Sequence, residues 1–181
     1  GMICSYVDVD ERRHAREDSI AFCSELRQRR PGIVFGADII AGFPGETDEE
    51  FAETLDFVKE IQFTGGHVFS YSPRPGTGAA KMKGQVKPEL RKRRNRILQE
   101  AIEESATSYR EKFIGQTMSV LWESTTEYGE YGWRMEGWTG NYLRVSATAP
   151  SPRWNEVDDV MLADFHAGVI RGTIVSADHH V

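Results

Sequence analysis

The chain has 181 residues, of which 39% are hydrophobic and 28% are charged, a composition typical of a soluble protein of one domain or two small ones. No apolar run approaches the roughly 20 residues of a membrane span, so we expect a cytoplasmic protein with no membrane partner. The formal net charge of -6 argues against indiscriminate nucleic-acid binding. Only Cys4 and Cys23 are present, which excludes a disulfide framework and a cysteine cluster with metal-ligand spacing.

The first half of the chain predicts alternating helices and strands. Apolar residues at helical spacing predict a helix over 15–29. Residues 33–41 form an almost continuous apolar run, which is typical of a strand buried on both faces of a parallel sheet. Thr47 and Glu50 form a capping box before the next helix, and a second strand is predicted over 67–72. Strand, helix and strand with short connections indicate a parallel βαβ unit.

Two loops follow these strands, and the carboxyl ends of parallel strands are where ligands of α/β proteins bind. The first loop contains Gly42, Gly45 and Glu46, and the second covers 71–77. Glycine lets a ligand approach the backbone closely, and a carboxylate is favoured at a helix start by the dipole. Two interpretations stay open: the loop shapes a ligand site, or the glycines only form a tight turn and Glu46 only caps the helix.

A long helix is predicted from Pro88, which fits a first helical position. The first half of this helix is basic and includes Arg91, Lys92 and Arg94. Basic residues at this end oppose the helix dipole, which suggests a reason outside the helix. The basic residues either form a solvated face with internal ion pairs or contact the phosphates of a nucleic acid.

Five short strands are predicted beyond Gly115, a number suited to a small antiparallel barrel of the oligonucleotide-binding kind. They cover residues 117–122, 133–138, 142–146, 157–165 and 169–175. Trp133, Trp138 and Tyr142 either pack in the barrel core or against the helix, or they stack on unpaired bases. Because acidic residues outnumber basic ones in this region, RNA contact would have to be local, through stacking.

Several long motifs carry a resemblance to a known family. D-I-I-A-G-F-P-G-E-T-D-E-E-F, which begins at Asp38, and F-S-Y-S-P-R-P-G-T, which begins at Phe69, resemble radical S-adenosylmethionine methylthiotransferases that modify the adenosine beside the tRNA anticodon. E-G-W-T-G-N-Y-L-R-V, which begins at Glu136, resembles the TRAM domain that ends these enzymes. R-R-H-A-R-E-D-S-I-A-F-C, from Arg12, resembles most closely the branch that acts on threonylcarbamoyl-adenosine.

The resemblance implies an α/β plus all-β fold in three parts. These are the last βα units of a radical S-adenosylmethionine (β/α) barrel over 1–84, a linker helix over 85–113, and a small five-stranded antiparallel TRAM barrel, similar to OB folds, over 114–181. The implied cofactor-binding residues are Arg12, Asp38, Ile40, Gly42, Glu46, Phe69, Tyr71 and Ser72. The implied RNA-binding residues are Arg91, Lys92, Arg94, Trp138, Asn141, Tyr142 and Arg144.

The resemblance also implies cofactors and partners. The full-length enzyme would use S-adenosylmethionine and 4Fe-4S clusters, with tRNA as its partner. A cluster needs thiolate ligands, and the family pattern C-x-x-x-C-x-x-C does not occur in this chain. We therefore expect no bound cofactor or metal and no catalysis without the missing N-terminal part. Alternatives are a truncated RNA-binding module, a module that self-associates through its exposed partial sheet, and an enzyme with a ribosomal-protein substrate.

Overall fold

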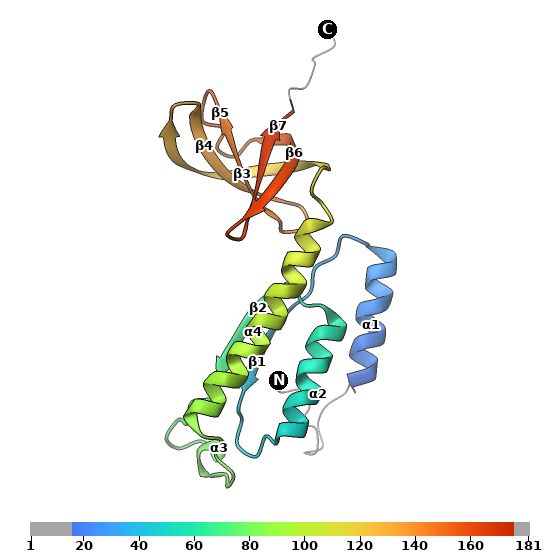
Figure 1. The fold of residues 1–181 in the computed structure, drawn as a ribbon, viewed down its shortest axis with the longest axis vertical. Coiled ribbons are helices and arrows are strands. Elements are labelled where there is room, and N and C mark those ends of the chain that lie inside the picture. The colour runs from blue at the N-terminus through green and yellow to red at the C-terminus, as the bar shows by residue number, and fades with distance from the viewer. Residues whose placement is uncertain (1–15, 176–181) are drawn as a thin grey trace. The chain divides into compact units, whose positions relative to one another are not determined.

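The computed structural model describes residues 16–175. Two compact units divide the chain, residues 1–107 and 108–181. The first consists of helices with a small parallel sheet, and the second is formed mainly by a five-stranded sheet (Figure 1). None of the helices between residues 16 and 175 has the length and apolar character needed to cross a lipid bilayer.

The first unit is a βαβ unit with additional helices. Its elements are α1 (Arg16–Arg29), β1 (Gly36–Ala41), α2 (Asp48–Ile61), β2 (Gly65–Ser70), the short α3 (Gly78–Lys81) and most of α4 (Pro88–Glu111). Strands β1 and β2 pair in parallel, with Ile39 opposite Val68, which confirms the predicted βαβ unit. Helix α3, which was not predicted from the sequence, is capped by Thr77, whose hydroxyl accepts a hydrogen bond from the Ala80 amide.

Helix α2 begins where the sequence predicts because side chains cap its first turn. The Thr47 hydroxyl accepts a hydrogen bond from the Glu50 amide at 3.2 Å, and the Glu50 carboxylate accepts one from the Thr47 amide at 2.8 Å. These two reciprocal bonds form the predicted capping box. Farther along the helix, Phe57, Val58 and Ile61 are buried in the core of the unit.

The two faces of the parallel sheet differ. One face is covered by α2 and α4, whose apolar side chains share a core with Ile39 and Val68. On the two strands, Asp38, His67 and Phe69 are exposed. The prediction of a strand buried on both faces is therefore wrong for the described residues, because helices pack against one face only.

The second unit is a five-stranded sheet that closes on itself. Its strands are β3 (Thr117–Gly129), β4 (Gly132–Thr139), β5 (Arg144–Ala149), β6 (Val157–His166) and β7 (Val169–Ile174). The hydrogen-bonded order is β3-β4-β5-β7-β6, and β6 pairs in turn with β3. The inside is filled by alternate side chains of these strands, including Trp122, Met135 and Leu162.

The sheet is mixed, which corrects the prediction of an antiparallel barrel. Strands β5 and β7 are parallel, with Val145 opposite Ile170, whereas the other neighbouring strands are antiparallel. Strand directions cannot alternate all the way around a closed ring of five strands, so at least one neighbouring pair must be parallel. Strand β3 also continues to Gly129, well beyond the predicted end, because it pairs with β4 through two bulges.

Candidate functional site

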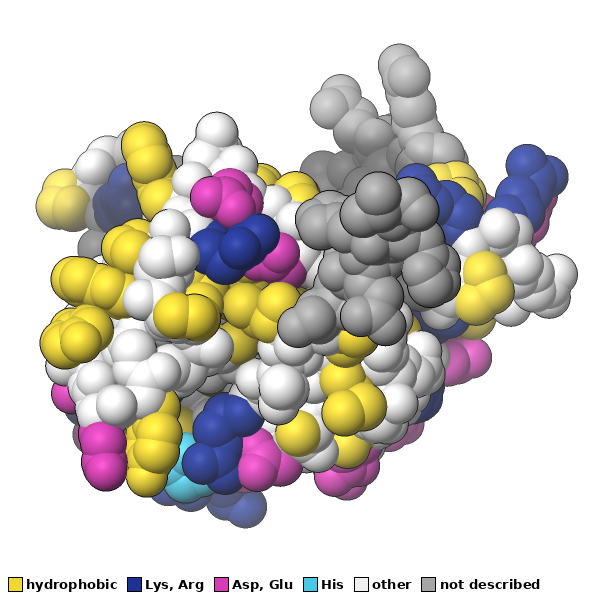
Figure 2. All heavy atoms as spheres, turned by 90° about the horizontal axis from the view of Figure 1, so that it is seen from above, with side chains coloured by type: hydrophobic (Ala, Val, Ile, Leu, Met, Phe, Trp, Pro, Cys, Tyr) yellow, Lys and Arg dark blue, Asp and Glu magenta, His cyan; other side chains and the backbone are white. Residues whose placement is uncertain are grey.

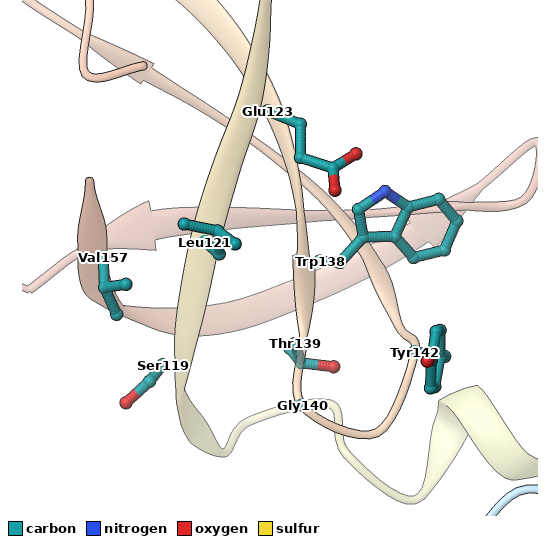
Figure 3. A pocket seen from close by; sticks show the side chains of 8 residues that line it. All are labelled: Ser119, Leu121, Glu123, Trp138, Thr139, Gly140, Tyr142 and Val157. Atoms are coloured by element: carbon teal, nitrogen blue, oxygen red, sulfur yellow. The ribbon is translucent and has the colours of Figure 1, made fainter. Parts of the chain in front are cut away.

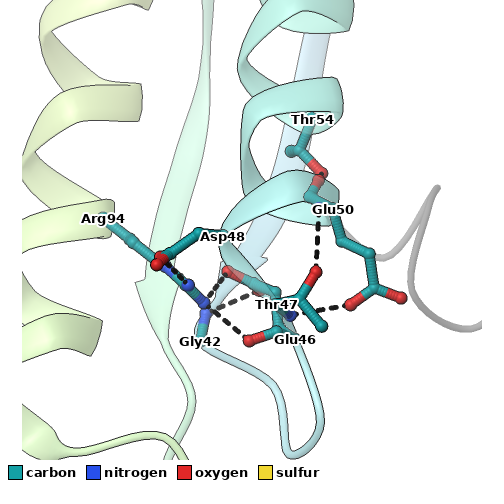
Figure 4. A network of polar contacts seen from close by, with 7 residues as sticks. All are labelled: Gly42, Glu46, Thr47, Asp48, Glu50, Thr54 and Arg94. Atoms are coloured by element: carbon teal, nitrogen blue, oxygen red, sulfur yellow. Dashed lines mark hydrogen bonds and ion pairs between the residues drawn. The ribbon is translucent and has the colours of Figure 1, made fainter.

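The loop after β1 is held by a buried ion pair with helix α4 (Figure 4). Glu46 is only 8% exposed, and its Oε1 lies 2.7 Å from Nη1 of Arg94. Its Oε2 accepts a hydrogen bond from the Gly42 amide at 2.9 Å. Arg94 also donates to the backbone carbonyl of Glu46 and to Asp48. Both carboxylate oxygens of Glu46 are thus used inside the protein, and Glu46 shapes the loop rather than offering its charge to a ligand.

The close approach of α4 explains the glycine at the start of this loop. Gly42 has φ +72°, and a Cβ atom at this position would lie 2.3 Å from Cγ of Arg91. Arg91 in turn donates a hydrogen bond to the backbone carbonyl of Tyr71, in the loop after β2. Helix α4 therefore fixes both loops, and the space freed by Gly42 is taken by Arg91.

These contacts show where three residues of the predicted RNA-binding set lie in the structure. Arg94 is 2% exposed and is paired with carboxylates, so its guanidinium cannot meet a phosphate in this structure. Arg91 is half-buried and holds the Tyr71 carbonyl. Lys92 is exposed. At Arg94, the basic charge near the N-terminal end of this helix is therefore explained by ion pairs within the protein. The sequence alone did not indicate these pairs.

A groove of about 570 Å³ lies at the carboxyl ends of β1 and β2. We call it the strand-end groove; its lining is Ile40, Phe43, Phe69, Ser70, Tyr71, Ser72, Arg74, Thr77 and Ala79. Four residues of the predicted cofactor set therefore come together here, namely Ile40, Phe69, Tyr71 and Ser72. The Tyr71 hydroxyl oxygen is buried and has no hydrogen-bond partner among the described residues.

The remaining members of that set lie elsewhere. Asp38 is exposed and its Oδ1 is 3.1 Å from Nδ1 of His67. Gly42 and Glu46 do not line the strand-end groove, although they support the loop that contributes Phe43. Arg12 lies outside the described residues. Phe43, which the sequence analysis did not single out, packs edge-on against Tyr71 with ring centroids 5.2 Å apart.

A second groove, of about 550 Å³, lies on the five-stranded sheet (Figure 3). We call it the barrel groove; its lining is Ser119, Leu121, Glu123, Trp138, Thr139, Gly140, Tyr142 and Val157. Trp138 is 38% exposed and Tyr142 is 74% exposed, so the alternative that placed these two rings in the core is wrong. Trp133 is half-buried and contacts Tyr128 with ring centroids 4.9 Å apart.

The turn that presents Tyr142 is built by hydrogen bonds beneath it. Tyr142 has φ +60°, a left-handed conformation that is uncommon for a bulky residue. Asn141 accepts a hydrogen bond from the Thr139 hydroxyl at 2.6 Å and donates one to the Tyr109 hydroxyl at 2.8 Å. The Thr139 hydroxyl also accepts one from the Leu143 amide at 3.0 Å. Asn141 thus supports the turn with its side chain, although the sequence predicts an RNA contact.

Arg144 and the missed residues complete this site. Arg144 pairs with Glu136 and does not line the barrel groove. Leu121, Glu123 and Val157 do line it, and the sequence analysis did not select them. One signal could have found two of them: residues 119, 121 and 123 alternate with the buried Val120 and Trp122, so they must point outward.

The thiol of Cys23 and the phenol of Tyr109 both have raised pKa values. Burial raises the pKa of the Cys23 thiol, although nearby Arg27 opposes the effect, so the thiolate that metals and clusters require is disfavoured. Burial also raises the pKa of Tyr109, against a smaller lowering by its hydrogen bond with Asn141. Within residues 16–175, no group of three or more His, Cys, Asp or Glu side chains could hold a metal ion.

Comparison with known proteins finds relatives that share one name. No family model matches the chain. The chain is 34% identical over 166 residues to tRNA-2-methylthio-N(6)-dimethylallyladenosine synthase of Ehrlichia canis (strain Jake), which covers 90% of the chain and 37% of that protein. The synthase of Yersinia pestis is 33% identical over 93% of the chain and 35% of its own length. That of Maricaulis maris (strain MCS10) is 32% identical over 92% of the chain and 36% of its own length.

These relatives confirm the resemblance found in the sequence. Nine-tenths of the chain aligns with enzymes of one name, at identities of about one in three. The chain is therefore a homologue of part of the tRNA methylthiotransferases. It spans little more than a third of the length of these curated relatives.

Proposed function

We propose that the chain is the C-terminal part of an enzyme that adds a methylthio group to an N6-modified adenosine beside the anticodon of tRNA. The observation that carries this proposal is the similarity over 90% of the chain to synthases whose name states a methylthio-modified adenosine of tRNA as the product. The position beside the anticodon follows from the resemblance found in the sequence. Because tRNA would be the substrate, the enzyme would act in the cytoplasm.

The architecture supports the same assignment of parts. A parallel βαβ unit with a groove at its strand ends suits the last units of a radical S-adenosylmethionine barrel over 1–84. Helix α4 would be the linker of 85–113. The closed five-stranded sheet suits a TRAM domain of OB type over 114–181, because such domains are five-stranded Greek-key barrels.

The two implied cofactors fit this chain differently. The strand-end groove fits S-adenosylmethionine, since Phe69 and Tyr71 line it with flat rings and Ser70 and Ser72 add hydroxyl groups to its lining. When bound, this cofactor would supply the radical and the methyl group. A 4Fe-4S cluster does not fit, because Cys4 and Cys23 are too few thiolates for it. We therefore propose that the chain by itself is inactive.

The RNA contacts that we propose come from exposed residues of the predicted set. Trp138 and Tyr142 would stack on bases, and Lys92 and Arg144 would face phosphates. Figure 2 shows a few basic side chains next to acidic ones among hydrophobic and uncharged side chains, which favours local contacts over a broad electrostatic surface.

The gene that encodes this chain offers the direct test. We expect its deletion to remove the 2-methylthio form of N6-dimethylallyl-adenosine from total tRNA, measured by mass spectrometry of digested nucleosides. The precursor without the methylthio group should accumulate. Loss of the threonylcarbamoyl form instead would favour the branch that the residues from Arg12 suggest. If neither nucleoside changes, the proposal is wrong.

A second candidate function, a self-associating module, is favoured by one observation. Among residues 16–175, no helix covers one face of β1 and β2 and no third strand pairs with them, and Phe69 on that face is 52% exposed. Sedimentation of the 181-residue chain should then show a dimer that Phe69→Ser converts to a monomer. A wild-type chain that sediments as a monomer would remove this candidate.

A further inference from the structure

We propose that the barrel groove binds one unpaired RNA base and that Glu123 selects bases that carry an amino group on their pairing edge. This inference rests on the tRNA partner of the proposed function and adds a specificity-determining residue to it. It follows from three properties of the groove: exposed rings, a strained turn that holds one of them, and a carboxylate without a partner among residues 16–175.

The rings and apolar side chains give the groove an affinity for flat molecules. Trp138 and Tyr142 are exposed on one side of it, and Leu121 and Val157 are exposed on the other (Figure 3). Single-stranded RNA is bound mainly by stacking of bases on aromatic side chains. A groove lined in this way suits a single base that has left its stack.

The conformation of Tyr142 indicates that its position has a use. A bulky residue at φ +60° is strained, and such strain persists only where the surroundings enforce it. Here the hydrogen bonds of Thr139, Asn141 and Tyr109 enforce it. Packing does not explain the tyrosine, because the residue is about three-quarters exposed. The turn therefore holds an exposed ring at a fixed place beside Trp138.

Glu123 determines which part of a nucleotide can enter. Its carboxylate points toward the Trp138 ring, and it has no hydrogen bond or ion pair with the described residues. An ionised carboxylate repels phosphate and only accepts hydrogen bonds. It can therefore accept from the amino groups of cytosine or adenine, as acidic side chains do with cytosine N4. Uracil has a single N–H on its pairing edge, and this N–H lies between two carbonyl oxygens. Because the carboxylate repels these oxygens, we expect uracil to bind more weakly.

The experiment uses the 181-residue chain and RNA hexamers of cytidine, adenosine or uridine. We expect the cytidine or adenosine hexamer to bind about tenfold more tightly than the uridine hexamer, monitored by the Trp138 indole NMR signal. Glu123→Gln should reduce this ratio to about twofold or less, because an amide both donates and accepts. Glu127→Gln removes the same charge from β3 outside the groove and should keep the full ratio.

A second pair of variants locates the site. Trp138→Leu should weaken every hexamer about tenfold or more, whereas Tyr131→Leu, an exposed ring outside the groove, should leave binding unchanged. Because Trp138→Leu lacks the indole signal, binding of these two variants is measured by the fluorescence anisotropy of labelled hexamers. Circular dichroism checks that each variant folds. Equal loss in both variants, equal ratios in Glu123→Gln and Glu127→Gln, or no movement of the Trp138 signal would each overturn the inference. A shift of the Trp138 signal that only a basic peptide causes would also overturn the inference, because the groove would then bind a protein.

The outcomes also separate this inference from the proposed function. A base preference that depends on Glu123, combined with unchanged methylthio nucleosides in the deletion strain, would support the groove and refute the enzyme. Loss of those nucleosides without any base preference would do the reverse.

Discussion

Charged side chains serve opposite purposes in the two units. In the first, Glu46 and Arg94 are buried together and hold the loop after β1 to helix α4. In the second, Glu123 is exposed beside two exposed rings and has no partner among the described residues. Both carboxylates lie next to a groove, yet only Glu123 is available to a ligand. Burial and pairing, rather than residue type, separate a structural charge from a functional one.

The largest expected effect is the loss of the buried pair. Arg94→Ala leaves the Glu46 carboxylate buried without its partner, which costs about 3–5 kcal/mol of unfolding free energy. All four tryptophans lie beyond residue 107, so fluorescence reports the second unit while far-UV circular dichroism reports mainly the helices. Urea unfolding followed by dichroism should shift to lower concentration, with a much smaller shift by fluorescence.

Arg96→Ala is the matched control for this prediction. Its guanidinium is exposed and lies 3.7 Å from Glu100 in an i,i+4 pair, which is worth less than about 1 kcal/mol. If the two alanine variants lose similar stability, the pair of Glu46 and Arg94 is not the structural element that we describe.

A smaller effect is expected at the glycines of the same loop. Gly42→Ala introduces left-handed strain of about 1–2 kcal/mol and a clash with Arg91 of about 1–3 kcal/mol. Gly45→Ala has φ +88° and no atom within 4 Å of the new Cβ, so it introduces the strain alone. Denaturation of both variants isolates the contact with Arg91. Equal losses would mean that α4 does not depend on the absence of a side chain at residue 42.

Local features of the first unit could be predicted from the sequence. The capping box of Thr47 and Glu50 involves residues three apart, and the parallel pairing of β1 and β2 follows from one short helical connection. The burial of Arg94 could not be predicted, because it depends on Glu46, 48 residues away. A basic residue on an amphipathic helix is usually exposed, and only the three-dimensional contact reverses this expectation.

The second unit shows the same limit at its groove. Trp138 and Tyr142 were predicted as RNA contacts because the segment that contains them resembles a TRAM domain. Asn141 was predicted as a contact and instead supports the turn, because its partner Tyr109 lies 32 residues away. Glu123 is one of many carboxylates in an acidic region, and only its place beside Trp138 distinguishes it.

The support beneath Tyr142 should make the second unit sensitive to alkali. Burial raises the pKa of Tyr109 above its ordinary value of about 10, so the folded chain retains this proton to higher pH than the unfolded chain. The stabilising contribution is complete below about pH 10 and is lost as pH rises through the raised pKa. Fluorescence-monitored urea unfolding between pH 8 and about pH 11 should therefore show falling stability, and Tyr109→Phe should make the fall shallower. Tyr131→Phe, at an exposed ring, should leave the slope as in the wild type.

The smallest change in stability is expected at Tyr142 itself, and its sign is what matters. Asparagine tolerates φ +60° better than tyrosine, so Tyr142→Asn should stabilise the second unit by about 0.5–1 kcal/mol. The same variant should weaken RNA hexamers, because a stacking ring is lost. If Tyr142 is kept for stability, its replacement should lower both stability and RNA affinity. If Tyr142 is kept for function, its replacement should raise stability and lower RNA affinity. If Tyr142→Asn destabilises the chain, the ring of Tyr142 stabilises the fold. The groove beside Glu123 then loses its support as a ligand site, and with it the contrast to the buried pair of Glu46 and Arg94.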